Sequence, residues 1–159
     1  MPLTKQLATV VVARCRDFEH TASHLGAEAA VAQLADLRLD LLAAAETNGG
    51  LQLAADPMCA NFRFANPDEA VDLALYAASN GLVVGVDCGE LHVDEGLDAW
   101  GLAVARAIEL AATGQPGEVA CSNELLQQLK LPDGIGVFRA PEAREALVGH
   151  ATHMLRDYR

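Results

Sequence analysis

The residues best suited to metal chemistry are histidines that form two close pairs, His20 with His24 and His150 with His153. On a helix, residues three or four apart share a face, where two imidazoles can bind one metal ion. For the first pair, Asp17 or Asp56 could complete the ligand set. The more common alternative is a pair of solvated histidines near a helix start, and a solvated face is the better interpretation of the second pair.

The sequence also contains four cysteines, Cys15, Cys59, Cys88 and Cys121. None has the CxxC spacing of a zinc or redox motif, and each lies in an apolar stretch typical of a strand. We therefore expect buried free thiols rather than disulfides or zinc ligands. No Gly-rich phosphate loop, Ser-His-Asp set or reactive Cys-His pair is recognisable.

Length and composition predict one domain over residues 1–159. The chain is 52% hydrophobic and 21% charged, which is enough apolar material for a core without disulfides or structural metal. No apolar run approaches the roughly 20 residues of a membrane span, and the first residues lack the layout of a signal peptide. A soluble, cytoplasmic protein is expected.

The chain is strongly acidic. It has 11 Lys and Arg against 22 Asp and Glu, a net charge of −11, and no basic cluster. Such a surface repels nucleic acids and anionic lipids, because their binding depends on cations that neutralise phosphates. Neither a nucleic acid nor a membrane is therefore an expected partner.

Hydrophobic periodicity predicts the elements that position these residues. Apolar runs rich in β-branched residues predict strands, and apolar residues at helical spacing between caps and glycines predict helices. Asn66 and Pro67 mark a helix start, and Gly26 is a point where the first helix could break. The expected strands are 7–13, 51–55, 58–64, 82–86 and 117–121, and the expected helices are 21–47, 67–79, 98–113, 122–129 and 141–158.

The first six elements follow the order strand, helix, strand, strand, helix, strand. This order is a split βαββαβ unit, which predicts an α+β fold with a ferredoxin-like core, in which an antiparallel sheet carries helices on one face. Additional helix and strand elements follow this core toward the C-terminus.

Three parts of the sequence match the motifs of one family in the same order. The strongest comprises residues 85–90, 98–104 and 116–122, which read GVDCGE, DAWGLAV and PGEVACS. The second is 56–62, DPMCANF, which matches a hairpin motif, and the third is 10–21, a strand with the entry into a helix. Together they resemble the nucleotide cyclase homology domain of class III adenylate and guanylate cyclases over about residues 9–129. Residues 133–159 are a C-terminal extension.

The resemblance implies a head-to-tail homodimer with sites in its interface, where a ribose 3′-hydroxyl attacks the α-phosphate. Two aspartates of the family bind two metal ions, Mg²⁺ or Mn²⁺, for this reaction. One matches Asp56, but the other position is Arg16. Asp17, one residue further on, would point to the other face of a strand unless a bulge or the strand end intervenes. Arg16 is either a cation in place of a metal or a solvated arginine at a strand end.

The family recognises the purine base with a lysine and an aspartate, which match Gln52 and Asp98 here. Gln52 can still donate and accept hydrogen bonds at a base edge, so purine binding is weakened rather than lost. Asp98 has an equally good alternative as the N-cap of the helix that follows it.

The chain departs furthest from the family at the residues that stabilise the transition state. An asparagine and an arginine of the family, one helical turn apart, match Ala105 and Glu109. Glu109 reverses the charge that should attract a triphosphate, and Arg106 is about 100° away around the helix. In addition, residues 64–105 contain no Lys or Arg. Their acids are Asp68, Glu69, Asp72, Asp87, Glu90, Asp94, Glu95 and Asp98.

These replacements favour a cyclase homology domain that has lost catalysis and works without a cofactor as a dimerising signalling or regulatory module. Mg²⁺ or Mn²⁺ is expected only if the site is functional. One alternative is an active adenylate or guanylate cyclase, alone or completed by another cyclase-like subunit. A second is a ferredoxin-like domain that senses a metabolite at the remodelled interface. The expected partners are a second copy, another cyclase-like subunit or a signalling protein.

Overall fold

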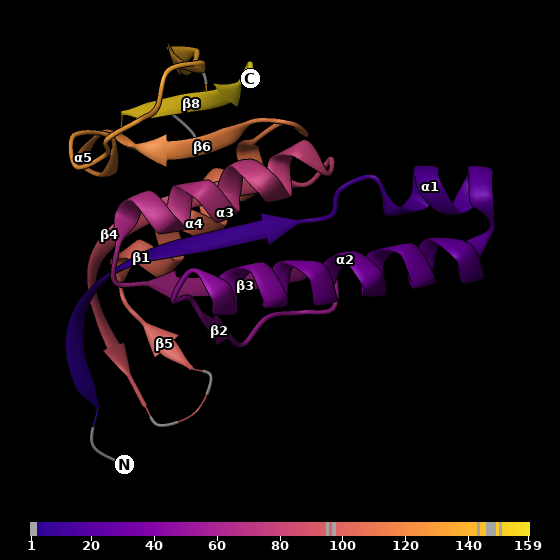
Figure 1. The fold of residues 1–159 in the computed structure, drawn as a ribbon, viewed down its shortest axis with the longest axis horizontal. Helices are drawn as coiled ribbons and strands as arrows, with labels where there is room; N and C mark the ends of the chain where they lie inside the picture. Colours follow the sequence, from indigo (N-terminus) through magenta and orange to yellow (C-terminus); the bar gives the residue numbers. More distant parts are fainter. Residues whose placement is uncertain (1–2, 95, 97, 143, 146–148, 150) are drawn as a thin grey trace.

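The computed structural model describes residues 3–94, 96, 98–142, 144–145, 149 and 151–159, and their strands form one eight-stranded sheet. The strand order is β2-β3-β1-β4-β6-β8-β7, with β5 paired to β4, and Figure 1 shows the helices around it. The β4–β6 pair is parallel and every other pair is antiparallel. The strands are β1 (Thr4–Arg14), β2 (Leu51–Leu53), β3 (Cys59–Phe64), β4 (Val83–Val93), β5 (Ala99–Trp100), β6 (Val119–Ser122), β7 (Ile135–Arg139) and β8 (Thr152–Asp157).

The helices begin and end largely at the residue types that favour such ends. Asn66 caps α3 by accepting a hydrogen bond from the Asp68 N–H, with Pro67 in the first helical position. Gly26, with φ of 88°, separates the first two helices as the sequence allows. The helices are α1 (Phe18–Leu25), α2 (Ala27–Thr47), α3 (Pro67–Ser79), α4 (Leu102–Thr113) and α5 (Asn123–Leu126). None of these described helices combines the length and hydropathy that a bilayer crossing requires.

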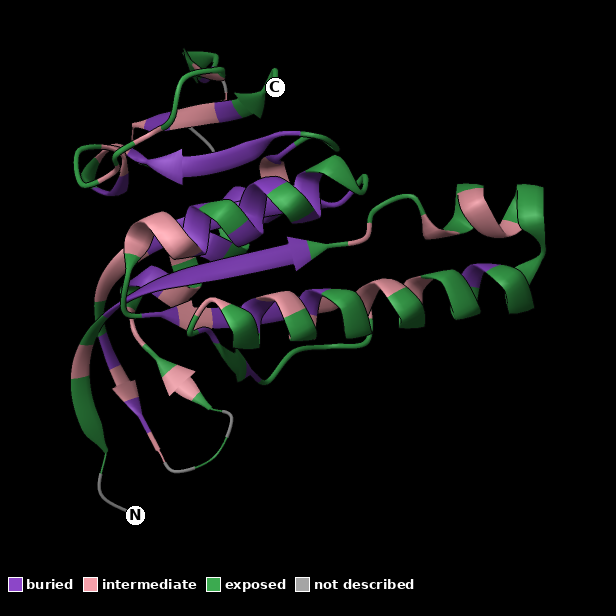
Figure 2. Ribbon diagram, in the orientation of Figure 1, coloured by how far each residue is buried: buried purple, intermediate pink, exposed green. Residues whose placement is uncertain are grey.

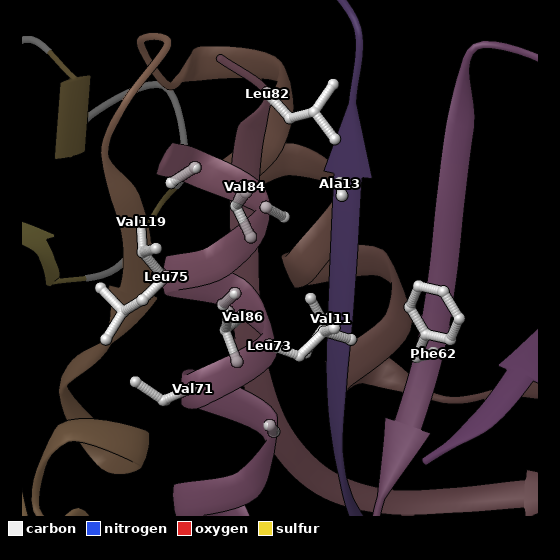
Figure 3. Close-up of a cluster of buried hydrophobic side chains, with 14 of the residues drawn as sticks. Val11, Ala13, Phe62, Val71, Leu73, Leu75, Leu82, Val84, Val86 and Val119 are labelled. Atoms are coloured by element: carbon white, nitrogen blue, oxygen red, sulfur yellow. The ribbon is translucent and has the colours of Figure 1, made fainter. Parts of the chain in front are cut away.

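The βαββαβ core is confirmed, and both faces of the sheet are covered. Side chains of β1 alternate between the two faces. Val11 and Ala13 join the main core with α2 and α3, part of which Figure 3 shows. Val10 and Val12 pack instead against α4, in a second cluster. The helices of the ferredoxin-like unit therefore cover one face, as predicted, and α4 covers the other. Figure 2 shows the later part of β1 buried between these layers, whereas the first residues of the strand are exposed.

The C-terminal extension corrects the prediction of a helix over 141–158. Residues 152–157 form β8, which pairs with β6 on one side and with β7 on the other. Leu155 is fully buried opposite Val119. Pairing of the edge of β6 outweighs the weak helical pattern of this segment, because an unpaired strand edge leaves backbone groups unsatisfied. Residues 143, 146–148 and 150, to which the prediction also applied, lie outside the described residues.

Candidate functional site

The predicted metal residues lie where the end of β1 meets the β2–β3 hairpin. Arg14 ends β1 directly opposite Cys59, and the Cys15 N–H donates to the Met58 carbonyl oxygen at 2.9 Å. Asp56 is exposed in the hairpin turn, and its Oδ1 accepts the Met58 N–H at 2.8 Å. One Asp56 oxygen therefore already stabilises the turn.

Cys59 lies beside Asp56 and was not a candidate from the sequence. Its Sγ is 3.7 Å from Asp56 Oδ2. Partial burial, together with the charge and hydrogen bond of Asp56, raises the pKa of this thiol to about 11. The thiol therefore stays protonated at neutral pH and donates toward the carboxylate. Asp56 thus has two local partners within the hairpin.

Arg16 and Asp17 follow the end of β1, and their side chains lie at different parts of the molecule. The Arg16 side chain is exposed, and its Nη1 donates to the carbonyl oxygen of Gly114, just beyond α4. Asp17 is the exposed N-cap residue of α1 and lines a cavity of about 270 Å³ together with His20. Asp56 does not line that cavity. Asp17 and Asp56 therefore do not line the same cavity.

The candidate metal ligands do not gather into one cluster among the described residues. These residues contain no group of three or more His, Cys, Asp or Glu side chains that could hold a metal ion. The rings of His20 and His24 have centroids 4.3 Å apart and planes tilted by 44°, and His24 Nδ1 lies 2.9 Å from the His20 carbonyl oxygen. His153 lies in β8 rather than on a helix, and His150 is outside the described residues.

The two predicted base-recognition residues lie on different elements. Gln52 is exposed on β2 and lines a cavity of about 320 Å³ with Arg38 of α2. Asp98 is exposed in the connection between β4 and β5 and does not line that cavity. The prediction that Asp98 caps the next helix is wrong, because Ala99 and Trp100 pair with β4 and α4 begins only after Gly101.

Ala105 and Glu109 are both exposed, one turn apart on α4. Arg106 is the only Lys or Arg of this helix. It is directed to the sheet side, where its Nη1 lies 4.0 Å from Oδ2 of the buried Asp87. The exposed face of α4 therefore presents a carboxylate and no cation.

Two buried acids that the sequence did not single out organise this part of the molecule. Asp87 is fully buried and accepts a hydrogen bond from the Ser122 hydroxyl. Glu118, 2% exposed, lies 2.6 Å from Arg144 Nη1 and 3.6 Å from Arg156 Nη2. A buried charge needs such partners. Glu118 belongs to the PGE motif, so the sequence did mark this position. Its arginine partners lie far along the chain, and only the fold shows that they contact it.

By sequence, the chain matches no protein-family profile and no curated protein. Its fold, however, is similar to solved structures of cyclases. The adenylyl cyclase CyaB from P. aeruginosa is 17% identical with a TM-score of 0.80, over 100% of this chain and 98% of that one. The catalytic core of a rhodopsin-guanylyl cyclase of converted specificity, in complex with ATPαS, is 16% identical with a TM-score of 0.81, over 99% of both chains.

A third similar structure is the guanylyl cyclase domain of the RhoGC fusion protein from the aquatic fungus Blastocladiella emersonii. Its monomeric form has a TM-score of 0.80 at 14% identity over 100% of both chains. A dimeric form has a TM-score of 0.77 at 14% identity over 96% of this chain and 97% of that one. Likeness over the whole chain at such low identity establishes the fold: the protein has the α+β fold of adenylyl and guanylyl cyclase domains.

Proposed function

We propose that this chain is a catalytically degenerate cyclase homology domain that works as a dimerising signalling or regulatory module in the cytoplasm. The exposed face of α4 carries the proposal. Ala105 and Glu109 occupy the positions matched to an asparagine and an arginine of the family, and Arg106 is held toward Asp87. Loss of one such transition-state donor costs roughly 3 kcal/mol of barrier stabilisation, and here both are replaced.

The surroundings of Asp56 support the same proposal. One of its oxygens accepts the Met58 N–H and the other lies beside the Cys59 thiol. Arg16, at the position matched to the second metal-binding aspartate, donates to Gly114 instead. We therefore propose no resident metal or nucleotide cofactor. Gln52 and Asp98 are the residues that would contact a nucleotide if one bound.

Exposed apolar side chains near α4 support a role in dimerisation. Trp100 is 50% exposed, Leu102 63% and Ile108 46%, although the chain as a whole is strongly acidic. Large apolar side chains that gather on a surface commonly mark an interaction site. The proposed occupant is a second copy of this chain, and another cyclase-like subunit or a signalling protein is the alternative.

A thermal-shift titration tests the loss of the nucleotide site. ATP, GTP, cyclic AMP and cyclic GMP are each added with and without Mn²⁺, to the wild type, to Asp56→Ala and to Asp36→Ala. Asp36 is an exposed residue of α2 and serves as the control. A ligand at about a hundred times its Kd adds roughly 2.7 kcal/mol and shifts Tm by several degrees. We expect no Mn²⁺-dependent shift with a triphosphate. A shift that Asp56→Ala removes and Asp36→Ala retains would contradict the proposal.

A further inference from the structure

A cavity of about 270 Å³ lies on the α2 and α3 side of the sheet. It is lined by the segment that joins β1 to α1, by the first turn of α1, by α2, and by the turn after α3. In Figure 1, α1 lies beyond the end of β1 and α2 runs back along the sheet. Its volume is near the lower end of the range for small-molecule sites, about 300 to 1,000 Å³. A compact ligand is therefore the right size.

Asp17 sets the charge of the cavity. It is the only Asp or Glu among the described lining residues, and none of them is a Lys or Arg. Although Asp17 occupies the N-cap position of α1, its side chain makes no capping hydrogen bond; the Thr21 N–H bonds its carbonyl oxygen instead. Burial raises the pKa of the neighbouring Cys15 thiol, so this group stays neutral. The cavity therefore presents one carboxylate and no Lys or Arg, and His20 is the one basic side chain among its described lining residues.

The remaining lining residues combine apolar surface with a few polar groups. Leu34 and Leu37 of α2 and Leu82 of the turn provide the apolar part. Thr21 and Gln33 place a hydroxyl and an amide on the same walls. Apolar walls with a small number of polar groups are typical of small-molecule sites. One carboxylate beside apolar walls fits an organic cation that has an apolar part.

We infer that this cavity binds a small protonated amine with an apolar body. The ammonium group pairs with Asp17, and the apolar body packs against Leu34 and Leu37. The net charge of −11 also favours the approach of a cation. The bound amine would hold the segment after β1, which the Cys15 N–H joins to the Met58 carbonyl oxygen of the hairpin. This inference does not depend on the proposed function, since the cavity does not include Asp56, Gln52 or α4.

Three probes of similar shape and different charge test it: cyclohexylammonium, cyclohexanol and cyclohexanecarboxylate. Each is titrated into ¹⁵N-labelled protein at constant ionic strength while amide chemical shifts are recorded. We expect saturable binding of cyclohexylammonium below about 10 mM, weaker binding of cyclohexanol and none of the carboxylate. The shifted amides should be those of residues 15–21, 33–37 and 80–82.

Two variants with the same charge change separate the cavity from general electrostatics. Asp17→Asn should weaken cyclohexylammonium roughly tenfold and leave cyclohexanol unchanged. Glu19→Gln, on the same helix at an exposed residue that does not line the cavity, should stay within about twofold of the wild type. Equal loss in the two variants would overturn the inference, as would equal affinity for all three probes, absence of saturable binding, or shifts that map to another surface.

Discussion

The buried carboxylate of Glu118 is expected to contribute to the stability of the fold. It is 2% exposed and contacts Arg144 and Arg156, which belong to the C-terminal extension. Removing one member of a buried pair leaves the other charge uncompensated, at a cost of about 3–5 kcal/mol. The Glu118–Arg144 contact therefore joins the extension to the residue that precedes β6.

We predict that Glu118→Ala lowers the free energy of unfolding by about 3–5 kcal/mol, as measured by urea denaturation. Glu109→Ala, which removes an exposed carboxylate from α4, should change it by less than about 0.5 kcal/mol. Similar losses in the two variants would show that the buried pair is not important for stability.

The contact between Asp56 and Cys59 can be tested by measuring the reactivity of the Cys59 thiol. Because the folded protein raises the pKa of Cys59 to about 11, its alkylation should keep accelerating as the pH rises from 9 toward 11, where an ordinary thiol has levelled off. Asp56→Asn removes a negative charge that disfavours the thiolate. We predict a lower pKa and faster labelling of Cys59 at pH 9, read by mass spectrometry of the Cys59 peptide. An unchanged rate, with Glu19→Gln as the control, would place the carboxylate away from the thiol in solution.

At the level of elements, α4 packs against β4 through a glycine. A Cβ added at Gly85 would clash with the Ala107 carbonyl oxygen and lie 2.6 Å from the Ala111 nitrogen, both of the α4 backbone. At Gly89, on the same strand, the nearest atom would be the Ala103 Cβ at 3.4 Å. A side chain at Gly85 would therefore force α4 away from β4, whereas a side chain at Gly89 would require little movement of the helix.

We predict that Gly85→Ala lowers the free energy of unfolding by at least about 2 kcal/mol, because helix backbone cannot rotate away as a side chain can. Gly89→Ala should cost less than about 1 kcal/mol. Denaturation curves for the two variants provide the measurement. Equal free energies of unfolding for the two variants would mean that α4 can move away from β4 without loss of stability.

The elements that the sequence predicted well are those with local signals. Val10, Val11 and Val12 favour a strand, and Asn66 with Pro67 begins α3 where expected. The sequence did not predict strand β8, because this segment is a strand through its pairing with β6. Pairing between distant segments leaves no local sequence pattern. Asp98 failed as a cap for a similar reason, since β4 extends to Val93 and β5 pairs back onto it.

At the candidate site, too, the sequence predicted the features that have local signals and missed those that depend on contacts between distant segments. Asp56 lies in the predicted hairpin, because a turn dipeptide between apolar segments is a local signal. The contact of Arg16 with Gly114 and that of Arg106 with Asp87 join parts of the chain that meet only in the fold. Sequence could therefore suggest that Arg16 and Arg106 lie near the candidate site, but it could not show which groups their side chains contact.

At the scale of the whole molecule, the exposed apolar side chains near α4 predict self-association. We expect a dimer in sedimentation velocity at tens of micromolar, and a monomer for the double variant Leu102→Asp, Ile108→Asp, because two buried carboxylates would oppose the interface. Tyr76→Asp, at a residue 43% exposed on α3 of the opposite face, should remain dimeric. A monomeric wild type, or a double variant that still dimerises, would exclude this interface.

The charge of the whole molecule also opposes nucleotide chemistry. The chain carries −11 overall, α4 presents Glu109 to solvent, and its Arg106 is directed to Asp87. A tetra-anionic nucleotide would depend on metal ions for its attraction, and the described residues offer no cluster to hold them. These features support the proposed loss of catalysis.

The proposed loss of catalysis is tested by measuring the formation of cyclic AMP and cyclic GMP from ATP and GTP by the purified protein with Mn²⁺. We expect no product above that of the heat-denatured protein, both alone and after mixing with a complete cyclase subunit whose own activity is subtracted. Clear turnover by the wild type that Asp56→Ala abolishes and Asp36→Ala preserves would instead show that the chain is an active cyclase.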